Sequence, residues 1–434
     1  MKNTVYIETY GCSANQNNSE ILAGLLTQAG YIVTNNQELA DIIILNTCIV
    51  KARTESKIKR RIQDLKQFSK HHLLIISGCM PDTDAKKILN INPNAIFLGT
   101  HHFKEIVKLI RDFQENKLDL EKQNIYLEEH HEIKLNIPKI PQNKLISINQ
   151  ISEGCLGNCT YCKTRLAKGK LNSYPKDLIL KSIENDLKQG AKEIWITSQD
   201  NAAYGMDKNK KQLPDLLKSI LKLKHRFKLR LGMMDPNNVL PILNELIEIY
   251  KDKKIYKFLH IPIQSASNQV LKHMNRLYTI EQVEKIIKEF RKAIPEIVIS
   301  TDIIVAYPTE TKEDHKKNAG FLERYKPSIL NLSRFSSHKQ TPAGKLKEIP
   351  TSIAKKRMKE LMQLHRQTAK ENKKRYMEKT IDVFINKKIG SSLHQARDEN
   401  YNLVLIKCDK NMLGKQVKIK IKDIGVHHMI GEVM

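Results

Sequence analysis

Three cysteines in the middle of the chain stand within one short run, Glu153-Gly-Cys-Leu-Gly-Asn-Cys-Thr-Tyr-Cys-Lys-Thr164. Iron–sulfur clusters are held by cysteine thiolates, and a 4Fe-4S cube needs one ligand for each iron. This run supplies three, so one iron stays open to a substrate or cofactor. A structural zinc site would need a fourth Cys or His nearby, and the sequence up to Pro175 offers none. The spacing therefore predicts a reactive cluster on Cys155, Cys159 and Cys162.

The first part of the chain alternates short apolar runs with helical patterns. This alternation predicts an open parallel α/β domain over residues 1–115. One helix is expected over Ser19–Ala29, ended by Gly30, and a basic helix is expected from Ala52. The expected strands are Val5–Thr9, Asp41–Leu45 and Leu73–Ile76.

Three further cysteines each follow one of these strands. Cys12 follows the first strand, Cys48 the second and Cys79 the third. Ligands of open α/β sheets gather beyond the carboxyl ends of the strands, so we expect the three thiols to converge although they are far apart in sequence. Three thiolates at one sheet edge predict a second open-site cluster. The alternative is three cysteines that are buried independently.

A second series of strands and helices begins after a charged and polar segment, residues 116–144, which predicts a linker. Helical patterns such as Pro175–Gln189 and Ile280–Ala293 separate the strands of this series. The pattern predicts an incomplete (β/α)6 barrel over residues 145–375, with its reactive groups at the carboxyl ends of the strands. The expected strands are Leu145–Ile151, Glu193–Thr197, Lys228–Leu231, Lys257–Ile263, Val298–Val305 and Ile329–Leu332.

The residue pattern changes in the last part of the chain, after a basic helix of about Ser352–Lys379. Three stretches of residues 376–434 alternate apolar and polar residues, which predicts a small closed antiparallel β-barrel. Cys408 is expected to be a core thiol there. Lysines alternate on one strand and are interpreted either as solubilising charges on an edge strand or as a surface that faces nucleic acid; they are Lys418, Lys420 and Lys422.

The net charge of +27 favours a polyanionic partner. Compositional drift toward Lys, Ile and Asn would scatter the excess, but two segments concentrate it. Lys51–Lys70 carries eight Lys and Arg against two acids, and Thr351–Thr380 carries ten against three. Nucleic acid is therefore the favoured partner.

The cysteine count and the N-terminus bear on the cellular compartment. Seven cysteines are an odd number for a disulfide framework, and the sequence from Met1 runs into a strand without the pattern of a signal peptide. No stretch approaches the roughly 20 apolar residues of a membrane helix. We expect a cytoplasmic protein without a membrane partner.

The Cys155–Cys162 run, with Tyr161 between the second and third cysteines, resembles the signature of radical S-adenosylmethionine enzymes. The order of the three parts resembles the radical S-adenosylmethionine methylthiotransferases. In that family an N-terminal domain holds an auxiliary cluster, a TIM-like barrel holds the radical cluster and a C-terminal TRAM domain binds tRNA. The runs that resemble the auxiliary-cluster set are Tyr10-Gly-Cys-Ser-Ala-Asn-Gln-Asn17, Asn46-Thr-Cys48 and Ser77-Gly-Cys-Met-Pro81.

The resemblance implies two 4Fe-4S clusters and S-adenosylmethionine as both radical source and methyl donor. The cluster on Cys155, Cys159 and Cys162 would bind S-adenosylmethionine at its open iron. The cluster on Cys12, Cys48 and Cys79 would hold the sulfur that is transferred. A reducing electron donor and a sulfur source are implied partners, beside tRNA.

The resemblance also suggests contacts to S-adenosylmethionine on the barrel loops, although no catalytic residue is assigned beyond the cluster ligands. Asp200 has the alternative of capping a loop, Asp302 that of a buried strand carboxylate, and Tyr161 that of a core aromatic. Two histidine pairs, His71-His72 and His101-His102, are expected to be exposed rather than to bind a metal, because adjacent side chains diverge. The candidate cofactor contacts are Tyr161, Gln199, Asp200, Gln264, Ser265 and Asp302.

The run from Glu153 to Pro175 and the run Thr197-Ser-Gln-Asp-Asn-Ala-Ala-Tyr-Gly205 look most like the archaeal and eukaryotic branch of the family. That branch methylthiolates carbon 2 of N6-threonylcarbamoyladenosine beside the tRNA anticodon. Three alternatives stay open at this point. They are methylthiolation of isopentenyladenosine in tRNA, methylthiolation of a ribosomal-protein aspartate, and a non-enzymatic iron–sulfur protein that binds RNA.

Overall fold

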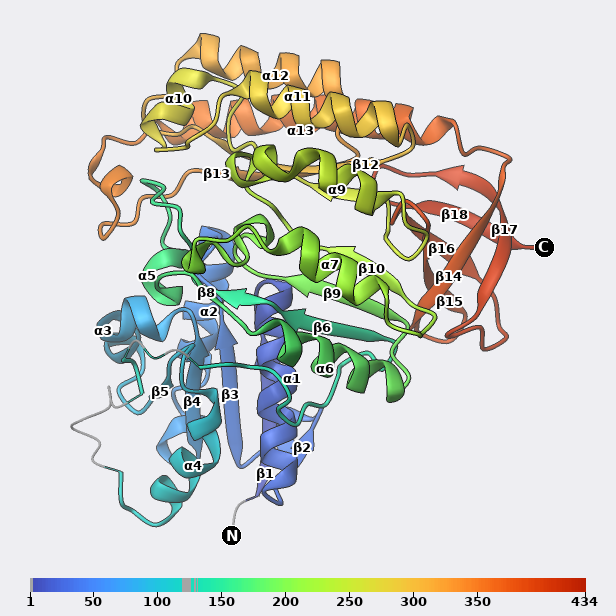
Figure 1. Cartoon of the computed structure of the whole chain (residues 1–434). Helices are drawn as coiled ribbons and strands as arrows, with labels where there is room; N and C mark the ends of the chain where they lie inside the picture. Colours follow the sequence, from blue (N-terminus) through green and yellow to red (C-terminus); the bar gives the residue numbers. More distant parts are fainter. Residues whose placement is uncertain (1–2, 119–125, 129, 131) are drawn as a thin grey trace.

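The computed structural model describes residues 3–118, 126–128, 130 and 132–434. Figure 1 shows a sheet with its helices at the N-terminal end, a larger set of strands and helices in the centre, and a small barrel at the C-terminal end. The expected α/β architecture is confirmed. Part of the segment expected to be a linker, residues 119–125, 129 and 131, lies outside the described residues.

The N-terminal part is built on a five-stranded sheet in which every pair of neighbours is parallel. Its strand order is β2-β1-β3-β4-β5. Four helices cover it: α1 (Ser13–Gln28), α2 (Ala52–Asp64), α3 (Pro81–Ile91) and α4 (Ile106–Gln114). The strands are β1 (Thr4–Thr9), β2 (Ile32–Thr34), β3 (Ile42–Thr47), β4 (Leu73–Gly78) and β5 (Ile96–Leu98).

Helix α1 begins at Ser13, six residues before the expected start at Ser19, so that boundary was wrong. The extra turns contain asparagines, which have low helix propensity. Tertiary contacts outweigh this preference, because the Asn15 Nδ2 donates to Tyr10 O at 2.9 Å and to Thr47 O at 2.8 Å. The asparagines thereby tie the first turn of α1 to the loops after β1 and β3.

The central part contains the six expected strands, all parallel, in two three-stranded sheets of order β10-β9-β6 and β11-β12-β13. An isolated bridge between Leu229 and Ile255 joins the two sheets where β10 meets β11. The result is an open barrel. The strands are β6 (Ile146–Gln150), β9 (Glu193–Thr197), β10 (Lys228–Leu231), β11 (Phe258–His260), β12 (Val298–Val305) and β13 (Ile329–Arg334).

Amphipathic helices pack around the outside of these strands and bury their apolar faces against them. A two-stranded ribbon, β7 (Ser152–Glu153) with β8 (Asn172–Ser173), flanks the cysteine run. The helices of the central part are α5 (Thr164–Lys168), α6 (Lys176–Lys188), α7 (Leu213–Leu221), α8 (Pro236–Val239), α9 (Leu243–Tyr250), α10 (Asn268–His273), α11 (Ile280–Ala293) and α12 (Lys312–Tyr325).

Helix α13 (Thr351–Lys374) leads into the C-terminal part, which is the expected closed β-barrel. The barrel is not wholly antiparallel as expected, because β16 and β18 pair in parallel. Ile419 and Ile421 point into its core, whereas Lys418 and Lys422 are exposed and Lys420 is half-buried, as the alternation predicted. Its strands are β14 (Thr380–Ile389), β15 (Leu393–Asp398), β16 (Leu403–Lys407), β17 (Gln416–Ile424) and β18 (Met429–Val433).

The C-terminal barrel packs on the amino ends of the central strands. The ring centroid of Tyr401 lies 4.9 Å from that of Tyr256 and 5.0 Å from that of Phe258. The guanidinium carbon of Arg230 lies 5.4 Å from the Tyr401 ring centroid. This contact leaves the carboxyl ends of the strands, where a barrel enzyme places its chemistry, for the N-terminal part.

Candidate iron–sulfur site

The run of Cys155, Cys159 and Cys162 forms a tight loop between β7 and α5. The Cys155 amide donates to Gly169 O at 3.2 Å, and the Cys162 amide donates to Cys159 O at 3.1 Å. All three cysteines are half-buried. Burial is the main reason that the pKa of Cys155 is raised to about 12, and the neighbouring Cys159 and Cys162 raise it further. A metal must therefore displace the protons before the loop can bind it.

The backbone at Gly154 sets this loop against the segment after α5. Gly154 has a φ of 79°, and a Cβ at this position would lie 1.9 Å from Lys170 O. No residue with a side chain fits here without a shift of one segment. The close approach of Gly154 to Lys170 fixes the position of Cys155 at the start of the loop.

Arg276 is a functional residue that the sequence did not reveal. Its Nη1 donates to the Cys159 Sγ at 3.1 Å, and its Nη2 lies 2.6 Å from Asp235 Oδ2. The guanidinium carbon lies 4.9 Å from the Tyr278 ring centroid. Arg276 follows α10 in a loop, and a single arginine among other charged residues gives no local signal of such a contact.

Asp235 connects Arg276 to the expected cofactor residue Asp200. The Asp200 carboxylate accepts hydrogen bonds from the Asp235 amide at 2.9 Å, the Ala202 amide at 3.0 Å and Asn238 Nδ2 at 2.7 Å. Asp200 is buried, and burial is the main reason that its pKa is raised. The contact to Ala202 is the loop cap that the sequence offered as the alternative role of Asp200.

The other expected cofactor residues lie near the carboxyl ends of their strands. Gln199 has a buried Oε1 without a hydrogen-bond partner among the described residues. Gln264 has a φ of 61°, and its amide donates to Asp302 O at 2.8 Å. The buried Ser265 accepts from the Ser267 amide at 3.2 Å.

Two expected contacts have protein partners of their own. The Asp302 Oδ2 lies 2.5 Å from His260 Nε2. Tyr161 packs beside Val270 and Met274, with its ring centroid 6.5 Å from that of Tyr307. Asp302 and Tyr161 are half-buried, so neither is the fully buried residue of its structural alternative. The contacts to S-adenosylmethionine stay a prediction.

The three N-terminal cysteines lie in loops after β1, β3 and β4, which are neighbours in the sheet. The Cys79 amide donates to Thr47 O at 3.1 Å, beside Cys48. Gly11, which precedes Cys12, has a φ of 112°, and a Cβ there would lie 2.9 Å from the Cys48 Sγ. The three loops therefore meet at the carboxyl edge of the sheet, as the sequence predicted.

Each cysteine set supplies three soft thiolates, which are ligands that iron–sulfur clusters take, and the clusters themselves stay a prediction. Within the described ranges, no group of three or more His, Cys, Asp or Glu side chains has the spacing of a site for a single metal ion. Cys408 lies in the C-terminal barrel, just after β16, and belongs to neither set.

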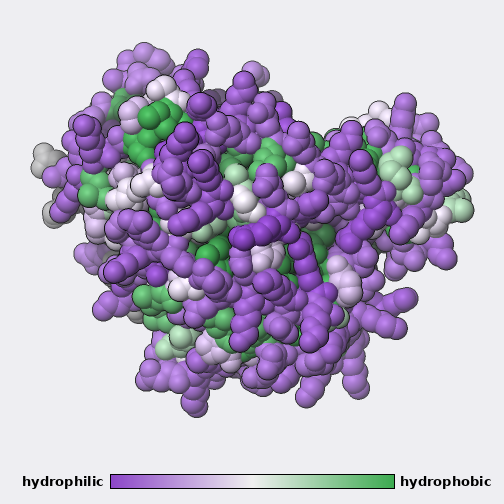
Figure 2. Space-filling model, turned by 90° about the horizontal axis from the view of Figure 1, so that it is seen from above, coloured by the Kyte–Doolittle hydropathy of each residue, from purple (hydrophilic) through white to green (hydrophobic). Residues whose placement is uncertain are grey.

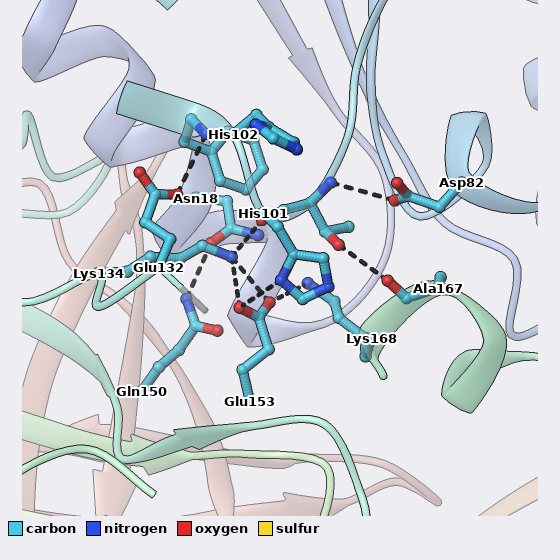
Figure 3. A network of polar contacts seen from close by, with 12 residues as sticks. Asn18, Asp82, His101, His102, Glu132, Lys134, Gln150, Glu153, Ala167 and Lys168 are labelled. Atoms are coloured by element: carbon cyan, nitrogen blue, oxygen red, sulfur yellow. Dashed lines mark hydrogen bonds and ion pairs between the residues drawn. The ribbon is translucent and has the colours of Figure 1, made fainter. Parts of the chain in front are cut away.

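A buried ionic network surrounds Glu153, which stands two residues before Cys155 (Figure 3). Glu153 accepts from Lys134 Nζ at 2.7 and 2.8 Å and from Lys168 Nζ at 2.6 Å. Burial alone would raise the pKa of Glu153, but the two ammonium charges outweigh it and lower the pKa. Lys134 comes from the segment expected to be a linker.

His101 belongs to this network, so the expectation that it is exposed was wrong. Only 5% of His101 is exposed, and its Nδ1 lies 3.6 Å from Glu153 Oε2. His71 is exposed, as predicted. The argument that adjacent side chains diverge holds for helices and strands. It did not apply to His101, because His101 lies in a loop before α4, beside Glu153.

Further contacts hold the N-terminal part against the cysteine run. Gln150 Nε2 donates to Asn18 Oδ1 at 2.8 Å, and Thr100 Oγ1 donates to Ala167 O at 2.9 Å. Lys163, directly after Cys162, pairs with Asp84. These contacts come from both parts and fix the two cysteine sets relative to each other.

The fold and the paired cysteine sets define a radical S-adenosylmethionine protein with an added N-terminal domain. Residues 149–322 match the Radical SAM superfamily, and residues 4–99 match the uncharacterized protein family UPF0004. A radical S-adenosylmethionine methyltransferase from Kitasatospora setae, solved with cobalamin and a [4Fe-4S] cluster, shares the fold with a TM-score of 0.59. It is 12% identical, and the match covers 79% of this chain and 77% of that chain.

Relatives that match over nearly the whole chain identify the family within this class. A protein of Archaeoglobus fulgidus, named a probable threonylcarbamoyladenosine tRNA methylthiotransferase, is 37% identical over 99% of this chain and 98% of its own length. The Xenopus laevis and human threonylcarbamoyladenosine tRNA methylthiotransferases are 33% and 32% identical over 99% of this chain, and 76% and 73% of their own lengths are covered. The chain belongs to the threonylcarbamoyladenosine tRNA methylthiotransferase family.

Proposed function

We propose that this protein is an enzyme that replaces the hydrogen on carbon 2 of N6-threonylcarbamoyladenosine in tRNA with a methylthio group. The observation that carries the proposal is that three cysteines share one loop and three more follow neighbouring strands of one sheet, in a chain similar to such enzymes over its whole length. Carbon 2 is unactivated, so ordinary acid–base chemistry does not reach it, and a radical cofactor does.

Cys155, Cys159 and Cys162 would hold a 4Fe-4S cluster that supplies the electron for cleavage of S-adenosylmethionine. The chain's own residues hold the loop in place: Gly154 permits its close approach to Lys170, and Arg276 donates to Cys159. The contacts to S-adenosylmethionine are proposed to come from the loops after the strands, from Tyr161, Gln199, Asp200, Gln264, Ser265 and Asp302.

Cys12, Cys48 and Cys79 are proposed to hold a second 4Fe-4S cluster, which binds the sulfur to be transferred. Support comes from the two buried thiols, Cys48 and Cys79, which share the sheet edge with Cys12. Burial raises the pKa of both buried thiols, so without a metal Cys48 and Cys79 would stay protonated at neutral pH. Iron would stabilise the thiolates.

The domain roles follow the three parts of the chain. Residues 1–115 would carry the sulfur site, residues 145–375 the radical site, and residues 376–434 a TRAM-like tRNA-binding barrel, with residues 116–144 between the first two. Within the described part of the chain, no helix combines the length and the apolar character needed to cross a membrane. A reducing electron donor and a sulfur source in the cytoplasm would complete the reaction.

Nucleoside analysis tests the proposal directly. Cells that lack methylthiolation of threonylcarbamoyladenosine receive this gene, and their tRNA is digested and measured by mass spectrometry. The proposal predicts a new 2-methylthio-N6-threonylcarbamoyladenosine peak, absent with the Cys159→Ala variant. A 2-methylthio-isopentenyladenosine peak, a modified ribosomal-protein aspartate, or neither with intact clusters would contradict the substrate proposed here.

A further inference from the structure

Helix α2 carries a row of cations on its outer face. Arg53, Lys57 and Arg60 are exposed and stand four and three residues apart, so they are neighbours on one side of the helix. The other side of α2 buries Ile58 and Ile62 against the N-terminal sheet. The packing of α2 on the sheet therefore holds the row of cations toward solvent.

No acidic side chain in the described part of the chain pairs with this row. The flanking cations of α2 differ in this respect. Lys59 Nζ lies 2.6 Å from Glu55 Oε1, and Arg61 is paired in the same way with a carboxylate of β1. Of the two acids of α2, Glu55 is buried and Asp64 is the last residue of the helix. An ordinary solubilising surface mixes charges of both signs, whereas this face presents positive charge alone.

Helix α2 begins beside one cysteine set and contacts the segment that follows the other. Cys48 stands four residues before Ala52, the first residue of α2. In the first turn of the helix, Glu55 Oε2 lies 3.7 Å from Nζ of Lys163, the residue directly after Cys162. The row of cations therefore starts close to the residues that would hold both clusters.

A polyanion fits this row, because unpaired cations that contact phosphates release the counterions bound to them. Arg53 and Arg60 are about 10 Å apart along the helix axis. A nucleic-acid strand carries one negative charge per roughly 3.4 Å, so the row can face about three successive phosphates. In the proposed reaction the modified adenosine has to reach both cysteine sets, which brings its own strand to the start of α2.

We infer that the exposed face of α2 binds the phosphate backbone of the tRNA anticodon arm beside the adenosine that is modified. Arg53, in the first turn of α2, contacts the phosphates closest to that adenosine, and Lys57 and Arg60 contact those farther along the strand. The N-terminal part thereby takes part in tRNA binding as well as in sulfur transfer. This inference rests on the proposed function, since it takes tRNA as the substrate.

The test measures binding by the full-length protein of tRNA that carries N6-threonylcarbamoyladenosine, and of its isolated anticodon stem-loop. One variant combines Arg53→Glu, Lys57→Glu and Arg60→Glu, and a second has Gln at the same positions. Filter binding at several salt concentrations should show about a tenfold or greater loss of affinity for both RNAs in the Glu variant. The Gln variant should reduce the slope of log affinity against log salt by about 2 to 3.

The matched control combines Lys104→Glu, Lys108→Glu and Arg111→Glu. These three residues are exposed, have the same spacing as the row on α2, and change the net charge by the same amount. They lie on or just before α4, whose Ile106 and Leu109 pack on the opposite face of the sheet from α2. Charges that far from the bound strand are screened by salt, so the control should change the affinity for either RNA less than about threefold.

Three results would overturn the inference. They are equal losses in the α2 and α4 reversals, a loss with tRNA but not with the anticodon stem-loop, and an unchanged tRNA affinity in the Glu variant, which would leave the face to an acidic protein. Failure of the wild-type protein to bind tRNA would overturn the proposed function as well. Binding by wild type that is lost in the α2 variants, without methylthiolation of the bound tRNA, would contradict the proposed reaction and support this inference.

Discussion

Arg276 is one of the residues that connect the loop of Cys155, Cys159 and Cys162 to the rest of the barrel. Its guanidinium donates to a cluster-ligand sulfur and pairs with Asp235, which in turn donates from its amide to Asp200. Hydrogen bonds to the sulfurs of an iron–sulfur cluster raise its reduction potential. In the proposed cluster on Cys155, Cys159 and Cys162, the Arg276 donor would raise the reduction potential.

Arg276→Gln should lower the reduction potential of that cluster and slow production of 5′-deoxyadenosine by about tenfold, because a charge-assisted donor to sulfur is lost. The potential is measured by electron paramagnetic resonance in a variant without Cys12, Cys48 and Cys79. The reduction potential of Arg276→Lys should lie between those of the wild type and Arg276→Gln. An unchanged potential in Arg276→Gln would show that the 3.1 Å contact to Cys159 does not influence the cluster.

At the scale of residues, the sequence predicted where the six candidate cluster cysteines lie and missed the charged side chains around them. Cysteine spacing and the position of each cysteine after a strand are local signals. Lys168, Arg276 and His101 acquire their roles from segments that are distant in sequence. Burial of a charged residue depends on those partners, so no local pattern announces it.

Gly154 determines how the element β7, the cysteine run and α5 fit together. Gly154→Ala should destabilise the apo-protein by more than about 2 kcal/mol, since positive φ alone costs an alanine roughly 1–2 kcal/mol and the Cβ would also meet Lys170 O. Iron content of the radical site should fall as the loop shifts. Thermal unfolding and iron analysis after reconstitution measure the two effects.

Gly190→Ala is the control for Gly154→Ala. Gly190 also has a positive φ, 104°, but a Cβ there meets nothing within 4 Å. This variant should lose only the stability that a positive φ costs an alanine, and its iron content should stay unchanged. Equal losses in the two variants would contradict a specific contact between Gly154 and Lys170.

His365 makes the packing of α13 sensitive to pH. The side chain is buried, and neither ring nitrogen has a hydrogen-bond partner among the described residues. Burial, with the nearby charges of His427 and Lys373, lowers the pKa of His365 from 6.5 to about 4. The unfolded chain therefore binds a proton between these values that the folded chain does not, and stability falls as the pH drops below 6.5.

His365→Leu should remove this dependence. The wild-type protein should lose about 2 kcal/mol of stability from this group between pH 7.5 and pH 5, and the variant should lose that much less. Urea unfolding of the apo-protein at both pH values measures the difference. Identical losses in the two proteins would mean that His365 is already charged when folded.

At the scale of elements, long periodic segments were predictable and short or polar ones were not. The six central strands and α11 lie where the apolar patterns placed them. The three-residue strands β2 and β5 were missed, because so short a run carries no period. The first turns of α1 were missed because their asparagines are stabilised by contacts to other loops.

Helix α13 contacts both the central part and the C-terminal barrel. Near its start, Arg357 Nη1 donates to Glu310 Oε1 at 2.6 Å, beside the carboxyl end of β12, and near its end Lys373 Nζ donates to Val426 O in the C-terminal barrel at 2.9 Å. Its 24 residues span about 36 Å. Figure 2 looks onto this side of the molecule and shows a mainly hydrophilic surface. We expect the exposed Lys and Arg side chains of α13 to contact the tRNA backbone.

Reversal of three exposed charges on α13, with Lys355, Lys359 and Arg366 replaced by Glu, should weaken tRNA binding and reduce the slope of log affinity against log salt by about 3. Filter binding at several salt concentrations measures this. The control is the same reversal on and just after α6, which lies on the opposite side in Figure 1. It changes Lys181, Lys188 and Lys192. Equal effects of the two reversals would show that only net charge matters.

At the scale of the whole molecule, the order of the three parts was predictable and their contacts were not. The C-terminal barrel covers the amino ends of the strands through Tyr401, and residues 132–135 of the segment expected to be a linker place Lys134 in the buried network. Each contact joins residues far apart in sequence. Local patterns fix elements, but only the assembled fold brings such residues together.

The central claim is that the two cysteine sets do different parts of one reaction. The most direct measurement quantifies 5′-deoxyadenosine and methylthiolated nucleoside from the same reaction, with S-adenosylmethionine, dithionite, a sulfide source and tRNA, for wild type, Cys159→Ala and Cys48→Ala. The account predicts that Cys159→Ala forms neither product, whereas Cys48→Ala still forms 5′-deoxyadenosine and no methylthiolated nucleoside. Loss of both products to the same extent in Cys48→Ala would contradict it.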